Sequence, residues 1–263
     1  MLIALTRAVP LSINRCELTH VERTPIDYAR AVEQHECYEH ALRTLGCRVE
    51  RLPEAAEMPD SVFVEDTAVV FDHLAVIARP GAASRRGEVA ATVAAMGRYR
   101  QLAFIQAPGT LDGGDVLVTS RQVFVGDTPR TNDDGARQLA AFIAPLGLDV
   151  VRVPVTKCLH LKSAVSNLPD GELLVNPDWI DASYFKGFAP MEVDPQEAAS
   201  ANVLAIGDRV LCAAEFPRTR ALLEARGFVT LPVPAGELAK AEGGLTCGSL
   251  VFRFQQSSPL GPI

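Results

Sequence analysis

The hydrophobic pattern of the chain is dominated by pairs of short apolar runs joined by a few turn residues. One pair links residues 67–71 to residues 74–78 across Asp72-His73, and similar pairs occupy residues 115–126, 163–176 and 202–212. Short runs rich in β-branched and aromatic residues, separated by two or three turn-forming residues, are typical of β-hairpins. The sequence therefore predicts four hairpins, and residues 248–254 begin a fifth unit that the N-terminal strand, residues 2–6, would complete.

Segments with helical periodicity lie between the hairpins. Thr24-Pro25-Ile26-Asp27 has the composition of a helix N-terminus with proline at the first helical position, and apolar residues then recur on one face up to Gly46. Further helices are predicted at residues 86–96, 133–144 and 219–225.

The polar residues that head successive units are regularly spaced. They lie 42 to 50 residues apart and are Asp60, Thr110, His160, Asn202 and Thr246. Such a spacing is typical of a propeller or another repeat array. We therefore expect an α/β fold in which five modules of two strands, a helix and a further strand surround a central axis. Because no linker interrupts the pattern, residues 1–254 are expected to form one domain and residues 255–263 a flexible tail.

Composition narrows the classes of function. The 263 residues carry a net charge of −7, which disfavours a nucleic-acid partner. No apolar run approaches the roughly 20 residues of a membrane span, so we expect no membrane partner and a cytoplasmic location. The six cysteines form no CxxC pair, so they are predicted to be reduced thiols, and neither a metal nor another cofactor is expected.

Cys247 is the candidate nucleophile. It follows Gly243-Gly244 and Thr246, where the backbone can turn sharply and place a side chain toward a cavity. Taken alone, a small thiol near the start of a strand is more often a packing residue. His160, between two leucines, is likewise more often a hydrogen-bonded core residue than a catalyst.

Acidic segments elsewhere in the chain favour a catalytic role for Cys247 and His160 over a packing role. Glu65 and Asp66 are embedded in apolar residues, where burial without a cation would be costly. A guanidinium is a natural partner because it is planar and permanently charged. Asp112 and Asp115 flank a glycine pair, for which a simple turn is an equally good interpretation.

Arginines precede two of the predicted helices. Arg85 and Arg130 both lie in loops, and a single arginine in such a place is usually a solvated surface residue. If both reached the mouth of one cavity, they would suit a substrate carboxylate. The ligand would then be an amino acid with a cationic side chain.

These segments together resemble the dimethylarginine dimethylaminohydrolase family of the guanidino-group-modifying (pentein) superfamily. The segments that carry the resemblance occur in order from the first strand to about Phe254, and they are residues 60–66, 79–86, 110–115, Arg130-Thr131-Asn132, residues 159–162, Ala201-Asn202 and Leu245-Thr246-Cys247. Each motif is weak alone, but the ordered set is specific. The family fold is a five-bladed α/β propeller of ββαβ modules, in agreement with the repeat count.

The resemblance implies hydrolysis of Nω-methylated arginines to citrulline and a methylamine. It implies that Cys247 attacks the guanidinium carbon to give an S-alkylthiouronium intermediate, that His160 is general acid and then base, and that Asp112 is the acid of the triad. Some relatives carry glutamate at the position of Asp112.

The resemblance also implies a set of substrate contacts. Asp66 would hold the guanidinium, with Phe63 and Glu65 toward its methylated end. The α-amino group would meet Asp60 and the backbone carbonyls of Leu18 and Ala241, and the α-carboxylate would meet Arg85 and Arg130. Ala241 and Glu242 stand where the family usually has a larger aliphatic residue and an aspartate. Leu18 lies in a loop, residues 9–24, that could close over the site as a lid.

Two other functions stay open on the sequence. An arginine deiminase or related amidine hydrolase is the nearest alternative, although such enzymes usually carry a helical insertion that this chain lacks. A non-catalytic binder of arginine-like amino acids is the second, although the chain retains Cys247, His160 and Asp112. A homodimer is a further possibility.

Overall fold

The computed structural model describes residues 1–254, which form five three-stranded sheets. The predicted tail, residues 255–263, lies outside the described residues. The strands are, in chain order, β1 (Leu2–Thr6), β2 (Cys47–Arg51), β3 (Ala68–Val70), β4 (Leu74–Ile77), β5 (Gln101–Phe104), β6 (Val116–Val118), β7 (Val123–Asp127), β8 (Val150–Pro154), β9 (Val165–Asn167), β10 (Leu173–Val175), β11 (Pro190–Glu192), β12 (Leu204–Ile206), β13 (Arg209–Ala213), β14 (Val229–Val233) and β15 (Leu250–Arg253).

Every sheet has the same topology. Its middle strand pairs antiparallel with the strand before it and parallel with the strand after it, as β4 does with β3 and β5. The fifth sheet closes the ring, because β15 pairs antiparallel with β1, with Leu2 opposite Arg253, and β1 pairs parallel with β2. The four predicted hairpins and the pairing of the two chain ends are confirmed.

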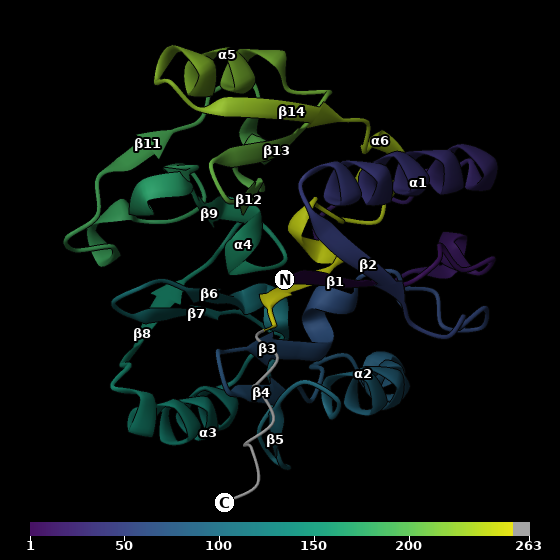
Figure 1. The fold of residues 1–263 in the computed structure, drawn as a ribbon, viewed down its shortest axis with the longest axis vertical. Helices are drawn as coiled ribbons and strands as arrows, with labels where there is room; N and C mark the ends of the chain where they lie inside the picture. Colours follow the sequence, from purple (N-terminus) through teal and green to yellow (C-terminus); the bar gives the residue numbers. More distant parts are fainter. Residues whose placement is uncertain (255–263) are drawn as a thin grey trace, which may run out of the picture.

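Helices cross from the middle strand to the third strand in four of the five modules. The α-helices are α1 (Tyr28–Thr44), α2 (Val89–Met96), α3 (Asp133–Ile143), α4 (Leu161–Ala164), α5 (Pro217–Ala225) and α6 (Gly236–Ala239). Figure 1 shows α1, α2, α3 and α5 at the periphery, outside the sheets. In the fourth module a short 3₁₀ helix, η7 (Ala182–Tyr184), stands between β10 and β11.

The first helix begins later than the sequence predicts. Asp27 is its N-cap, and the Asp27 carboxylate accepts a hydrogen bond from the backbone N–H of Arg30 at 3.1 Å. An aspartate in this position satisfies a helix N–H that has no partner within the helix. The placement of Pro25 at the first helical position was therefore wrong.

Further 3₁₀ helices occupy the loops. They are η1 (Ile13–Arg15), η2 (Val64–Thr67), η3 (Ala83–Glu88), η4 (Gly113–Asp115), η5 (Ala144–Leu146), η6 (Pro169–Gly171), η8 (Ala198–Ala201) and η9 (Thr246–Gly248). Predicted helix 86–96 is thus divided, because residues up to Glu88 form η3 and α2 begins at Val89.

The apolar core consists of several clusters between neighbouring modules. One contains Ile3 and Leu5 of β1 with Ile77 of β4 and Met96 of α2. Packing between modules, rather than within one, therefore fixes the ring. No helix within residues 1–254 has the length and apolar character needed to cross a bilayer.

Candidate active site

A short helical turn precedes the first strand of each module and directs polar side chains to the centre. These turns are η2, η4, α4, η8 and η9. Asp66 lies in η2, Asp112 and His160 are the N-cap residues of η4 and α4, and Cys247 lies in η9. The ring thereby gathers residues that are far apart in sequence.

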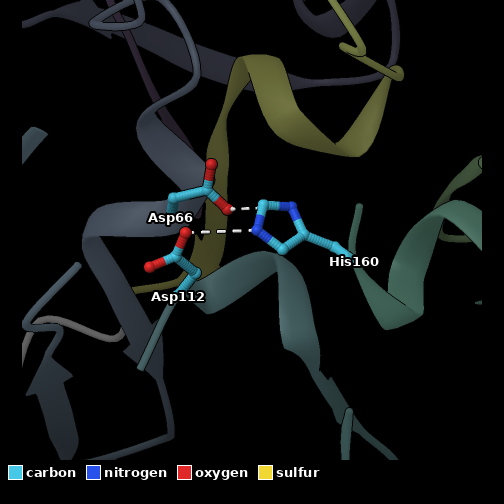
Figure 2. A group of neighbouring side chains, drawn as sticks. All are labelled: Asp66, Asp112 and His160. Carbon is cyan, nitrogen blue, oxygen red and sulfur yellow. Dashed lines mark hydrogen bonds and ion pairs between the residues drawn. The ribbon is translucent and has the colours of Figure 1, made fainter. Parts of the chain in front are cut away.

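His160 faces two carboxylates that lie on the same side of its ring (Figure 2). Its Nε2 is 3.2 Å from Asp112 Oδ2, and its Nδ1 is 3.7 Å from Asp66 Oδ1. Burial alone would lower the pKa of His160, but the charges of Asp66, Asp115 and Asp112 raise this pKa to about 9. The imidazole is therefore protonated at neutral pH and can act as an acid.

Asp112 is fully buried and held from two directions. Its Oδ1 accepts a hydrogen bond from the Gly81 N–H at 2.9 Å, and its backbone N–H donates to Thr131 Oγ1. Nη1 of Arg130 lies 3.8 Å from Asp112 Oδ2. These contacts fix the carboxylate that faces His160.

Asp66 is paired with a buried arginine on its other oxygen. Arg85 Nη1 donates to Asp66 Oδ2 at 2.6 Å, and the Gly114 N–H donates to Asp66 Oδ1 at 2.9 Å. Burial alone would raise the pKa of Asp66, but the charges of His160 and Arg85 lower this pKa to about 2. Asp66 is therefore an anion in the free protein and can attract a cation.

Arg85 donates hydrogen bonds to several protein groups besides Asp66. Its Nε and Nη2 grip Glu88 at 3.2 and 2.9 Å, and Nη2 also donates to the carbonyls of Asp60 and Phe63. Only 3% of the residue is exposed. The structure thus places Arg85 behind Asp66, and its contact with a substrate carboxylate stays a prediction.

Cys247 lies in the apolar cluster that also contains Phe63, Leu18 and Ala241. Its Sγ accepts a hydrogen bond from the Gly244 N–H at 3.3 Å. Burial and the charges of Glu65 and Asp66 raise the pKa of the Cys247 thiol to about 12. The thiol is therefore neutral in the unliganded protein.

Glu65 faces the same loop but is already paired. Lys162 Nζ lies 2.6 Å from Glu65 Oε1, and Thr246 Oγ1 donates to Oε2 at 2.7 Å. Asn202 in turn accepts from the Thr246 N–H and donates to the Lys162 carbonyl. This network ties the nucleophile loop to three other modules.

The predicted α-amino contacts are linked through the backbone of residues 17 and 18. Asp60 is buried, and both its oxygens lie 3.2 Å from the Glu17 N–H, next to the half-buried Leu18. Ala241 is 3% exposed and belongs to the same cluster as Leu18. Glu17 and Leu18 therefore connect Asp60 to the cluster that contains Ala241.

One group of side chains has the spacing of a metal site. Asp66, Asp112 and His160 offer ligand atoms within 4.8 Å of one another. Both carboxylates already accept hydrogen bonds from protein N–H groups, from Arg85 and Gly114 for Asp66 and from Gly81 for Asp112. The donor set suits the orientation of a histidine better than an ion.

Several residues of the site had not been assigned from the sequence. They are Gly114, Asp115, Lys162, Asn202, Thr246 and Glu88. Asp115 accepts from Thr128, Thr131 and the Leu161 N–H, and so supports the loop that carries His160. The regular spacing of Asn202 and Thr246 at the heads of modules was a signal that could have placed them at the centre.

Proteins of known sequence resemble the chain over most of its length. N(G),N(G)-dimethylarginine dimethylaminohydrolase of Streptomyces coelicolor is 44% identical over 238 residues, which are 90% of this chain and 91% of the relative. The protein of the same name from Pseudomonas aeruginosa is 36% identical over 86% of this chain and 90% of its own length. No protein-family model matches the chain.

Solved structures agree with this similarity. A dimethylarginine dimethylaminohydrolase variant in an adduct with S-methyl-L-thiocitrulline superposes with a TM-score of 0.91 at 34% identity, covering 96% of this chain and all of that one. A Pseudomonas aeruginosa variant complexed with citrulline gives 0.88 at 34% identity, covering 95% and 98% of the two chains. A cyanobacterial arginine dihydrolase domain gives 0.84 at 19% identity, covering 95% and 98%, which shows the fold alone. The predicted five-bladed α/β propeller is confirmed, and the chain belongs to the dimethylarginine dimethylaminohydrolase family.

Proposed function

We propose that the protein hydrolyses Nω-methylated arginines to citrulline and methylamine or dimethylamine. The observation that carries this proposal is the contact of His160 with both Asp112 and Asp66. Asp66 also contributes to the raised pKa that keeps the Cys247 thiol neutral. The relatives that share most of the chain are dimethylarginine dimethylaminohydrolases.

The substrate would bind with its guanidinium at Asp66 and Glu65. Asp66 offers an anionic oxygen, and Phe63, which is buried beside the nucleophile loop, provides an apolar wall for N-methyl groups. At the other end, Asp60 and the carbonyls of Leu18 and Ala241 would accept from the α-amino group. Arg130, with Arg85 behind Asp66, would attract the α-carboxylate.

A bound guanidinium would change the state of the thiol. Because Glu65 and Asp66 raise the pKa of Cys247, a cation placed between them and the sulfur would oppose that effect and lower the pKa. The thiol would then lose its proton to solvent, and the thiolate would attack the central guanidinium carbon to form a C–S bond.

Collapse of this tetrahedral adduct needs an acid. His160, protonated at neutral pH, would donate its proton to the leaving nitrogen as the C–N bond breaks, leaving an S-alkylthiouronium on Cys247. The neutral imidazole would then take a proton from water as the water oxygen attacks the same carbon. Cleavage of the C–S bond, with release of the hydroxyl proton to solvent, would yield citrulline and restore the thiolate.

A substrate panel tests this function. The pure protein is incubated with asymmetric dimethylarginine, monomethylarginine and arginine, and citrulline is quantified. Citrulline formed mainly from the methylated arginines supports the proposal, whereas citrulline formed mainly from arginine would identify an arginine deiminase. Binding of all three without any product would identify the non-catalytic binder.

The cytoplasmic location and the homodimer stay predictions of the sequence. The helices of residues 1–254, none of which could cross a bilayer, are compatible with the first. Size-exclusion chromatography with light scattering would decide the second.

A further inference from the structure

The loop of residues 17–22, here called the lid loop, is fastened at its base on both sides. Asn14 exchanges two hydrogen bonds with the backbone of Ile26, at 2.8 and 3.0 Å. Arg23 donates to the carbonyls of Asn14 and Cys16, each at 2.6 Å. These hydrogen bonds hold the two ends of the loop together. They do not reach the loop tip, whose position depends on other contacts.

The tip is held by one carboxylate that lies more than two hundred positions away in the sequence. Glu242 accepts hydrogen bonds from three successive backbone N–H groups, those of Thr19 at 2.8 Å, His20 at 2.5 Å and Val21 at 3.1 Å. Within the described residues 1–254, these N–H groups have no other acceptor. An ionised acceptor makes such bonds stronger than those between neutral groups.

The tip of the lid loop makes few apolar contacts that could hold it in place without the Glu242 carboxylate. Thr19, His20 and Val21 are exposed, and Val21 keeps 44% of its surface in solvent. Within the lid loop, Leu18 alone packs against the cluster that contains Cys247 and Ala241. The position of the tip in this structure thus rests on Glu242 and Leu18.

The backbone of Glu242 has an unusual conformation. Its φ is 59°, and it is the one non-glycine residue of the described chain with positive φ. A bulky residue reaches this left-handed region at a cost in energy. The residue before Glu242 is Ala241, whose carbonyl is a predicted contact of the α-amino group. Glu242 therefore links the lid loop to this predicted contact.

We propose that Glu242 is a positioning residue that latches the lid loop over the α-amino end of the bound substrate. The inference rests on the proposed function, because it concerns retention of the same amino-acid substrate. Asp60 holds Glu17 at the start of the lid loop, and Glu242 holds its tip. With the tip latched, Leu18 stays packed against the cluster that contains Ala241.

The latch should act on substrate affinity more than on chemistry. Glu242 has no hydrogen bond to Cys247, His160 or Asp112 among the described residues, so the reacting groups would keep their arrangement without it. An unlatched tip would let bound substrate leave more readily. KM should therefore rise while kcat changes little.

The experiment compares variants that separate the side chain from the backbone. Glu242→Gly removes the carboxylate but tolerates the left-handed conformation, so the fold should be kept. Glu242→Asp keeps a shorter carboxylate and should restore part of the effect. Glu22→Gln removes an exposed acid from the same loop and is the matched control. Steady-state kinetics with asymmetric dimethylarginine and hydrogen exchange of residues 17–22 are measured for each.

For Glu242→Gly we expect KM to rise at least about tenfold, equivalent to about 1.4 kcal/mol, with kcat within about threefold of the parent. Amide exchange should accelerate in residues 17–22, and Glu22→Gln should match the parent in both respects. A Glu242→Gly protein with the KM and the loop exchange of the parent would overturn the latch. If the parent itself forms no citrulline, the proposed function fails, while the exchange data still judge the latch.

Discussion

His160 Nε2 lies 3.2 Å from Asp112 Oδ2, inside a ring of modules that brings these residues together across 48 positions of sequence. The Gly81 N–H and the nearby Arg130 hold that carboxylate in place. The second ring nitrogen lies 3.7 Å from Asp66 Oδ1, so the imidazole faces two neighbouring carboxylates. The arrangement favours a protonated histidine ready to donate to a leaving amine.

Asp112→Asn should lower activity and shift its pH dependence. Loss of one carboxylate lowers the pKa of His160, so the decline of kcat on the basic side should move to lower pH. We expect kcat/KM to fall at least about 100-fold, the lower range of general acid–base effects. Asp208→Asn, at an exposed surface aspartate, is the control. If the basic side of the kcat–pH profile were unchanged in Asp112→Asn, Asp112 would not set the pKa of the catalytic acid.

The raised pKa of His160 also predicts a pH dependence of folding. With a folded pKa of about 9 and an ordinary value of 6.5, the histidine contributes stability that is fully present below pH 6.5 and is lost as pH rises through 9. Urea unfolding at pH 6.5, 7.5 and 8.5 should show a decline in the free energy of unfolding, and His160→Gln should flatten it. An equal slope in parent and variant would contradict the charged, buried imidazole.

Glu88→Gln should destabilise the protein. Glu88 and Arg85 are 2% and 3% exposed and share two short contacts. Loss of one charge from a buried pair costs about 3–5 kcal/mol, whereas an exposed pair contributes little. Glu57→Gln, which removes the exposed pair with Arg15, is the matched control in urea unfolding. Equal stabilities for the two variants would mean that Arg85 does not need Glu88.

Gly114→Ala should damage the site without unfolding the protein. A Cβ at this position would lie 2.6 Å from both Asp66 Oδ1 and His160 Nδ1, so one of them must move. We expect kcat/KM to fall at least about 100-fold through loss of acid–base positioning. Gly87→Ala is the control, because its Cβ would meet the flexible end of Met58. Parent-like activity in Gly114→Ala would show that the close packing of Asp66 and His160 is dispensable.

The local sequence pattern was sufficient to predict the repeating modules but not the ends of every helix. Alternating apolar residues and turn signals predicted the hairpins, because both depend on neighbours in sequence. The start of α1 was misplaced, since the cap at Asp27 competes with an equally plausible signal at Thr24-Pro25. The fourth module has a 3₁₀ helix between β10 and β11, which the general module pattern did not predict.

The sequence indicated which residues belong to the site but not which of their side chains contact one another. The contact of Arg85 with a substrate carboxylate stays a prediction, but no local pattern indicated that Arg85 is also buried against Glu88, three residues along the same turn. The contact of Thr246 with Glu65 joins residues 181 positions apart, and that of Glu242 with Thr19 joins residues 223 apart. Such contacts follow from closure of the ring, which no local pattern specifies.

The attack of Cys247 on a methylated guanidinium is the central claim. The most direct measurement is citrulline formation from asymmetric dimethylarginine by the parent and by Cys247→Ser, with mass spectrometry of acid-quenched parent protein to locate any covalent adduct. The account predicts citrulline from the parent, an adduct confined to Cys247, and no measurable turnover by the serine variant. A Cys247→Ser protein that forms citrulline at the parent rate would contradict it.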